Sequence, residues 1–149
     1  MAEYKNVEKP FLEKLKELDW KVIDQGSFGI PQDPTKSLRN NFKEVTLKDE
    51  FIKAVKRINT INGAQWLTDI QTEKIYQEVT ATEKSNLSLL EANKKVAEKL
   101  IGKTKTTVAK NELTDEQNPL VKLIDFDNWN NNTYTAINQF LVETPGAAR

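Results

Sequence analysis

Residues 121–142 read VKLIDFDNWNNNTYTAINQFLV and form the most β-like stretch of a mostly helical chain. Apolar residues gather near its two ends, around residues 123–126 and around residues 134–142. The Asn-rich run between them, residues 128–132, favours a turn, because asparagine tolerates positive φ and its side chain bonds the nearby backbone. We therefore predict a two-stranded hairpin here. An isolated hairpin is only marginally stable in water, so we expect the rest of the chain to cover it.

Four other segments have apolar residues at the spacing of amphipathic helices. They are residues 7–18, 46–59, 64–79 and 86–101. Short segments at residues 20–24 and 104–109 are rich in β-branched or aromatic residues and favour strands. This order of elements predicts an α+β fold in which helices pack on a small mixed β-sheet.

Size and composition exclude several classes of protein. The chain has 149 residues with no net charge, which predicts one soluble domain with a substantial core. It contains neither cysteine nor histidine, so it cannot form disulfides, thiolate or histidine metal sites, or a Ser-His-Asp triad. The absence of cysteine suits the reducing cytoplasm. There is no membrane-length apolar run and no glycine-rich phosphate loop, so we expect no membrane partner and no nucleotide site in this chain.

A basic segment is the one local indication of a polyanionic partner. Residues 94–110 hold six lysines and one glutamate, whereas residues 111–127 hold five acidic residues and one lysine. Lysines that neutralise phosphates would bind DNA without sequence preference and with strong salt dependence. The same lysines also fit a solvated helix face beside a protected sheet edge. The candidate DNA-binding residues are Lys94, Lys95, Lys99, Lys103 and Lys105.

Asp125 and Asp127 lie two positions apart in the first predicted hairpin strand. Side chains at this spacing share one face of a strand, and paired carboxylates could hold Mg²⁺. Acidic residues beside an Asn-rich turn also commonly cap the turn or face water. No complete metal site is predicted in this chain.

Three blocks of the sequence occur in a specific order and at a specific spacing. They read LRNNFKEVTLKDEFIKAVKRIN at residues 38–59, LLEANKKVAEKLIGK at residues 89–103, and VKLIDFDNWNNNTYTAINQF at residues 121–140. Together they resemble the N-terminal region of the R (restriction, motor-nuclease) subunit of type I restriction-modification enzymes. The residues in matching places are Arg39, Glu44, Val45, Leu47, Ile58, Asn59, Asn93, Leu100, Ile101, Gly102, Ile124, Asp125, Phe126, Asn128, Asn131, Tyr134, Asn138, Gln139 and Phe140.

The resemblance implies a nuclease domain of the PD-(D/E)xK type, of which this chain would form a partial core with a helical insertion at residues 46–102. The strand at residues 133–142 would be the first strand of that core. The opening helix would place Glu8 near the metal site, which makes Glu8 the candidate catalytic residue. The resemblance also implies DNA as substrate, Mg²⁺ and ATP as cofactors of the full-length protein, and modification (methyltransferase) and specificity subunits as partners.

One departure from the family pattern bears on activity. In the family the Pro-Asp and Glu-x-Lys motifs directly follow this strand, whereas the present chain stops at Arg149. We therefore expect the chain by itself to be an inactive N-terminal fragment without a cofactor of its own. The alternative is a self-contained α+β module for protein docking or non-specific DNA binding, whose similarity to the family reflects fold alone.

Overall fold

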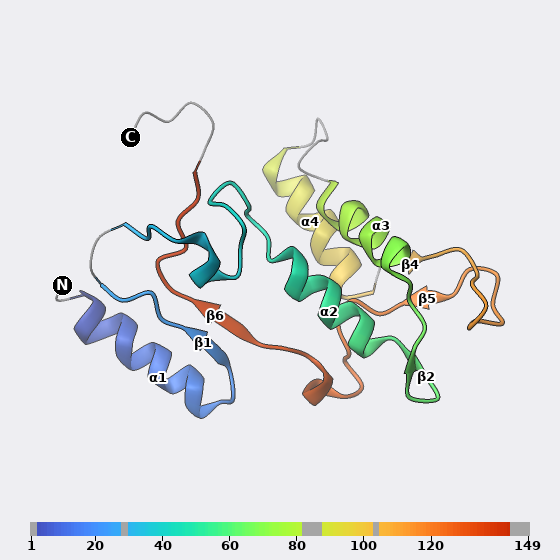
Figure 1. The fold of residues 1–149 in the computed structure, drawn as a ribbon, viewed down its shortest axis with the longest axis horizontal. Helices are drawn as coiled ribbons and strands as arrows, with labels where there is room; N and C mark the ends of the chain where they lie inside the picture. Colours follow the sequence, from blue (N-terminus) through green and yellow to red (C-terminus); the bar gives the residue numbers. More distant parts are fainter. Residues whose placement is uncertain (1–2, 28–29, 82–87, 103–104, 144–149) are drawn as a thin grey trace. The chain divides into compact units, whose positions relative to one another are not determined.

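The computed structural model describes residues 3–27, 30–81, 88–102 and 105–143 (Figure 1). The chain divides into two compact units. The terminal unit comprises residues 1–49 and 133–149, and the inserted unit comprises residues 50–132. Helices and short paired strands occur in the described residues, which confirms the predicted α+β class. A single folding domain with an insertion at residues 46–102 stays a prediction.

The terminal unit is built on one helix and one pair of parallel strands. A π-helical turn, η1 (Tyr4–Glu8), continues directly into α1 (Lys9–Glu17), and Pro10, which has no backbone N–H to donate, lies at this junction. Asp19 adopts a left-handed conformation after the helix, and β1 (Lys21–Ile23) follows. β1 pairs in parallel with β6 (Thr135–Ile137), as Figure 1 shows. The predicted helix and strand at the start of the chain are therefore confirmed.

Residues 30–47 of the terminal unit form a loop with a short 3₁₀ turn, η2 (Pro34–Ser37). Asp33 caps this turn by accepting a hydrogen bond from the backbone N–H of Thr35. Arg39 follows the turn and is buried. Near the other end of this unit, the backbone N–H of Glu143 donates to the carbonyl of Phe42, so the segment after β6 runs beside the loop.

The inserted unit is mainly helical. Its helices are α2 (Lys48–Ile58, whose first two residues belong to the terminal unit), α3 (Asp69–Thr80) and α4 (Leu89–Leu100). α3 and α4 each begin with a capping box, in which the Thr68 or Ser88 side chain and the side chain three residues later bond each other's backbone N–H. Gly102 follows α4 in a left-handed conformation, as its position in the sequence predicts.

Among its described residues, the inserted unit has two antiparallel strand pairs. β2 (Thr60–Ile61) and β3 (Ala64–Gln65) flank the dipeptide Asn62-Gly63, where both residues have positive φ. β3 occupies residues that the sequence pattern assigned to the start of a helix, so α3 begins later than predicted. β4 (Thr106–Thr107) pairs with β5 (Leu120–Val121). The core of this unit contains Val55, Trp66, Leu67, Ile75, Val79 and Val121.

The predicted hairpin at residues 121–142 is wrong. β5 pairs with β4, and β6 pairs with β1, so the two halves of the stretch belong to different strand pairs. The apolar residues of the first half serve the helical core instead, because Val121 is buried in it and Leu123 packs against it. The Asn-rich segment forms a compact loop with a 3₁₀ turn, η4 (Trp129–Asn131), instead of a tight turn between two strands.

No helix in the described part of the chain combines the length and the apolar character that a membrane span requires.

Candidate functional site

Polar side chains gather at the carboxyl ends of β1 and β6 in the terminal unit. We call this group the Glu8 cluster, and its members are Tyr4, Glu8, Asp24, Gln25, Asn138 and Gln139. Asp24 directly follows β1, and Asn138 directly follows β6. Because the two strands are parallel, these residues leave the sheet at the same edge. The carboxyl ends of parallel strands are a common position for ligand-binding and catalytic groups.

Asn138 joins the end of β1 to the start of α1. Its backbone N–H donates to the carbonyl of Ile23, and its Oδ1 accepts a hydrogen bond of 2.7 Å from the backbone N–H of Gln25. Its Nδ2 then donates to Asp24 Oδ1 at 3.0 Å and to Glu8 Oε2 at 3.3 Å. One amide side chain at the end of β6 therefore bonds both the segment after β1 and Glu8.

Gln139 supplies a second amide to the Glu8 carboxylate. Its Nε2 lies 3.1 Å from Glu8 Oε1 and 3.2 Å from Glu8 Oε2. The backbone of Gln139 is in the left-handed region, with φ of 50°. The side chain of Gln25 holds this segment by donating to the carbonyls of Asn138 and Gln139, at 2.8 and 3.1 Å. Both oxygens of Glu8 thus accept N–H groups from consecutive residues after β6.

Asp24 is the second carboxylate of the cluster. Tyr4 donates its hydroxyl to Asp24 Oδ2 at 2.5 Å, and the backbone N–H of Gly26 donates to Oδ1 at 2.9 Å. Burial disfavours the charge of Asp24, but the hydrogen bonds from Tyr4, Gly26 and Asn138 outweigh it and lower the pKa of this carboxyl. The same hydrogen bond to Asp24 raises the pKa of Tyr4.

A groove of about 250 Å³ lies beside the Glu8 cluster, between α1 and the segment that contains β6. Glu8, Asn138 and Gln139 form its polar part, and apolar side chains that include Phe11 and Leu15 form the rest. Phe11 is 62% exposed. The Glu8 carboxylate therefore borders a surface groove and is not sealed within the core.

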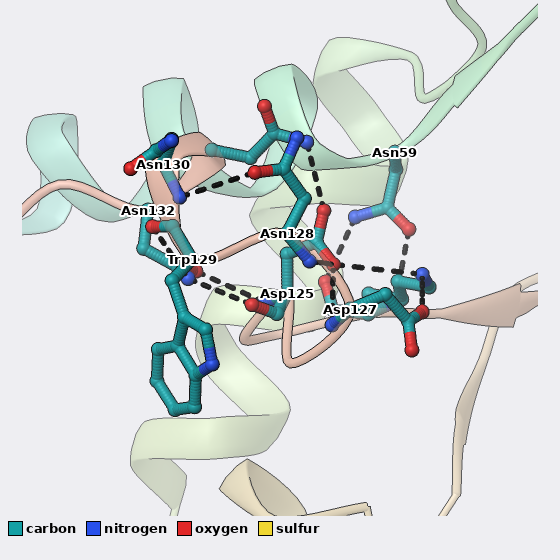
Figure 2. A network of polar contacts seen from close by, with 9 residues as sticks. Asn59, Asp125, Asp127, Asn128, Trp129, Asn130 and Asn132 are labelled. Atoms are coloured by element: carbon teal, nitrogen blue, oxygen red, sulfur yellow. Dashed lines mark hydrogen bonds and ion pairs between the residues drawn. The ribbon is translucent and has the colours of Figure 1, made fainter.

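The structure places Asp125 and Asp127 in a loop of the inserted unit (Figure 2). Asp125 is 4% exposed and accepts hydrogen bonds from the backbone N–H groups of Asp127 and Asn128 and from Asn131 Nδ2. Lys122 Nζ lies 2.7 Å from Asp127 Oδ2 and 3.7 Å from Asp125 Oδ1. The hydrogen bond from Asn131, then that from Asn128, outweighs burial and lowers the pKa of Asp125.

This loop is held by further amide side chains. Asn132 Oδ1 accepts from the backbone N–H of Asp125, and Asn132 Nδ2 donates to the Asp125 carbonyl. Asn59, which is buried, bonds both the N–H and the carbonyl of Lys122 (Figure 2). Asp125 therefore organises the loop, and its oxygens are already engaged by N–H donors. Across the described residues, no three or more Asp, Glu, His or Cys side chains come together to hold a metal ion.

The candidate lysines lie in the inserted unit, except that Lys103 falls outside the described residues. Lys94 and Lys95 are exposed on α4, and Lys105 is exposed before β4. Lys99 forms an ion pair within the inserted unit, because its Nζ lies 2.6 Å from Glu78 Oε1 of α3. Lys99 and Lys105 border a pocket of about 240 Å³ together with Lys122. The structure thus brings two of the predicted lysines to one pocket, while Lys94 and Lys95 do not line it.

Comparison with known proteins assigns the chain to a family. Residues 1–149 match the family described as type I restriction enzyme R protein N terminus. The chain belongs to this family. Asn138 and Gln139 are two of the residues on which the resemblance to this family rests. In the structure both side chains donate hydrogen bonds to the Glu8 carboxylate.

A curated relative supports the same assignment. The chain is 32% identical over 137 residues to a protein of Methanocaldococcus jannaschii named "Putative type I restriction enzyme MjaIXP endonuclease subunit". The aligned region covers 92% of this chain but 12% of that relative, so the R-protein N-terminal region is a small part of the relative's length. No solved structure matches the chain.

Sequence reasoning missed the partners of Glu8. Asp24 carried no signal of its own, and Asn138 and Gln139 were aligned with the family without a role. A useful signal existed in the dipeptide Asn138-Gln139, because two adjacent amide side chains directly after a strand offer several N–H donors at one sheet edge. The pairing partner of that strand was not visible, since Gln25 and Asn138 are 113 positions apart.

Proposed function

We propose that the protein carrying this R-protein N-terminal region is a DNA translocase and endonuclease of type I restriction-modification. It would hydrolyse ATP to move along DNA and cut both strands with Mg²⁺, as a site-specific deoxyribonuclease of the hydrolase class. It would act in the cytoplasm with modification and specificity subunits. Membership of the family and similarity to a protein named as an endonuclease subunit support this proposal.

Within that protein we assign the terminal unit to the nuclease domain, with Glu8 as its candidate catalytic carboxylate. One observation carries the assignment: Glu8 is held by amide donors at the carboxyl ends of two parallel strands, beside a groove. A carboxylate fixed at this position can contribute charge to a site where phosphodiester bonds are cut.

The described residues do not make a Mg²⁺ site by themselves. Mg²⁺ takes about six oxygen ligands in near-octahedral geometry. The Glu8 cluster offers two carboxylates, Glu8 and Asp24, and Asn138 Nδ2 lies between them as a hydrogen-bond donor to both. The other acids and the lysine of a PD-(D/E)xK centre would come from outside the described residues.

The test uses the full-length protein with its partner subunits, ATP, Mg²⁺ and circular DNA. Glu8→Gln should lower the rate of double-strand cleavage by roughly 10-fold or more while ATP hydrolysis continues. Glu13→Gln is a matched control, because Glu13 is an exposed carboxylate on the same helix. Undiminished cleavage by Glu8→Gln would remove Glu8 from the site.

A second function is favoured by the exposure of Lys94, Lys95 and Lys105 in the inserted unit. Exposed lysines can neutralise DNA phosphates and release counterions. We propose that this unit contributes non-specific DNA binding to the same enzyme. If the family resemblance reflected fold alone, such binding would be the function of a self-contained module, and the cleavage assay above separates the two possibilities.

A further inference from the structure

We infer that Gln139, together with Asn138, positions the Glu8 carboxylate toward the groove between α1 and β6. The inference rests on the proposed function, because it gives these amides a purpose only if the Glu8 carboxylate takes part in DNA cleavage. It assigns no contact with substrate to either amide. Both are positioning residues that act through Glu8.

The orientation of the Asn138 amide is fixed by its neighbours. Oδ1 accepts the backbone N–H of Gln25 at 2.7 Å, so the NH₂ end must face the opposite way. That end meets Asp24 Oδ1 and Glu8 Oε2, at 3.0 and 3.3 Å. A rotated amide would bring Oδ1 against two carboxylates and Nδ2 against an N–H donor. Asn138 therefore always presents N–H groups to Glu8.

Gln139 differs from Asn138 in what its side chain bonds. Asn138 holds the strand ends together, and its loss would disturb the fold as well as Glu8. The side-chain N–H of Gln139 is shared by the two oxygens of Glu8, at 3.1 and 3.2 Å, in an exposed contact. An exposed polar contact adds little to the stability of a fold, because water replaces it readily. Stability alone therefore gives little reason for this contact.

The backbone conformation of Gln139 supports the same inference. Its φ of 50° lies in the left-handed region, which costs a residue with a Cβ atom free energy. The backbone is held there by Gln25 Nε2, which donates to the carbonyls of Asn138 and Gln139. Such conformations concentrate at functional sites. Here the conformation accompanies a side chain that contacts both oxygens of one carboxylate.

The decisive variant is Gln139→Met in the full-length protein, which keeps the length of the side chain and removes its N–H donors. We expect the maximal cleavage rate to fall roughly 10-fold, a typical effect of removing a group that orients a catalytic residue. The DNA concentration for half-maximal rate, ATP hydrolysis and the thermal unfolding midpoint should stay as in the wild type. Asn41→Leu is the matched control, because Asn41 Nδ2 donates to the Glu44 carboxylate in the same unit.

A double-variant cycle separates positioning from an independent effect. If Gln139 acts through Glu8, Gln139→Met in a Glu8→Gln background should lower cleavage no further than Glu8→Gln alone. Equal, additive losses would overturn the inference. So would a lower unfolding midpoint with a parallel loss of ATP hydrolysis in Gln139→Met, since that result would make the amide structural.

The outcomes also separate this inference from the proposed function. Wild-type cleavage by Gln139→Met beside an inactive Glu8→Gln would overturn the positioning role and leave Glu8 in place. Wild-type cleavage by Glu8→Gln would overturn the assignment of Glu8 and, with it, the purpose of both amides. Asn138→Asp provides a second variant, because it keeps Oδ1 for Gln25 and sets a carboxylate oxygen against Glu8. It should lower cleavage at least as much as Gln139→Met.

Discussion

The guanidinium carbon of Arg39 lies 3.6 Å from the centre of the Phe140 ring. Nη1 of the same group donates to the carbonyls of Glu44 and Leu141, at 2.9 and 2.8 Å, and Nε donates to Ser37 Oγ. Arg39 therefore joins the loop after η2 to the segment after β6. Burial lowers the pKa of this guanidinium, but an arginine stays charged at any physiological pH.

Arg39→Lys should destabilise the protein by about 2 kcal/mol, because lysine keeps the charge but loses the planar stack and the forked hydrogen bonds. Urea unfolding measures this loss. The matched control is Arg57→Lys, since Arg57 donates two N–H groups to one carbonyl at an exposed position. The control should cost less than about 1 kcal/mol. Equal losses in both variants would contradict a special role for the buried stack.

The loop around Asp125 should make stability depend on acid pH. The folded-state pKa of Asp125 is below its ordinary value of 3.8. Its charge therefore stabilises the fold above pH 3.8, and that contribution is lost as the pH falls through the lower folded-state pKa. The free energy of unfolding of the wild type should thus fall more steeply in this range than that of Asp125→Asn.

Urea unfolding at a series of pH values from about 5 to 2 measures this dependence. Asp125→Asn should also be less stable than the wild type at neutral pH, because its new NH₂ group faces the donor Asn131 Nδ2. Asn130→Ser, an exposed change in the same loop, should keep the wild-type slope. Identical slopes for wild type and Asp125→Asn would show that the carboxylate does not stabilise the loop.

The candidate DNA-binding lysines should differ in their contribution to DNA binding, because Lys99 is held in an ion pair. Replacing Lys94, Lys95 and Lys105 by Gln should weaken DNA binding by the full-length protein, and the slope of log affinity against log salt should fall by about 0.9 for each lost phosphate contact. Lys99→Gln should have a smaller effect, because Lys99 already pairs with Glu78. Lys103 is the remaining candidate lysine, and Lys103→Gln tests it by the same measurement.

Fluorescence anisotropy with labelled duplex DNA across a salt series measures these slopes. Lys53→Gln is the control, since Lys53 lies in the same unit and pairs with Glu50 at 3.3 Å. If the triple variant keeps the affinity and the slope of the wild type, these lysines are solvated surface residues that do not contact DNA.

Local sequence patterns predicted the elements whose causes are local. The helices α2, α3 and α4 follow apolar spacing and end or begin with residues suited to caps, such as Ser88 and Gly102. The start of α3 was misplaced, because Asn62-Gly63 forms a turn between strands of only two residues each. Strands this short leave no alternating pattern to detect.

The error at residues 121–142 has a different cause. Side-chain bonds to the backbone decide that segment: Asp125 accepts the N–H groups of Asp127 and Asn128, and Asn132 bonds both polar backbone groups of Asp125. These bonds replace the ladder that a hairpin would form. Turn propensity alone cannot distinguish a two-residue turn from a longer loop with its own hydrogen-bond network.

The candidate site was predictable only in part. The family resemblance pointed to Glu8, but neither the pattern nor the resemblance showed which residues surround it. That information depends on the parallel pairing of β1 with β6, in which Lys21 lies opposite Thr135. A periodicity within one strand reveals its faces and says nothing about its neighbour.

The same pairing sets an order of events when the chain is made. Glu8 leaves the ribosome early, and Asn138, its amide partner, follows 130 residues later. The inserted unit is continuous in sequence and can collapse first, whereas β1 must wait for β6 across a very long loop. The surroundings of Glu8 are therefore completed only after the inserted unit and β6 have been made, and the growing chain carries this carboxylate without its amide partners until then.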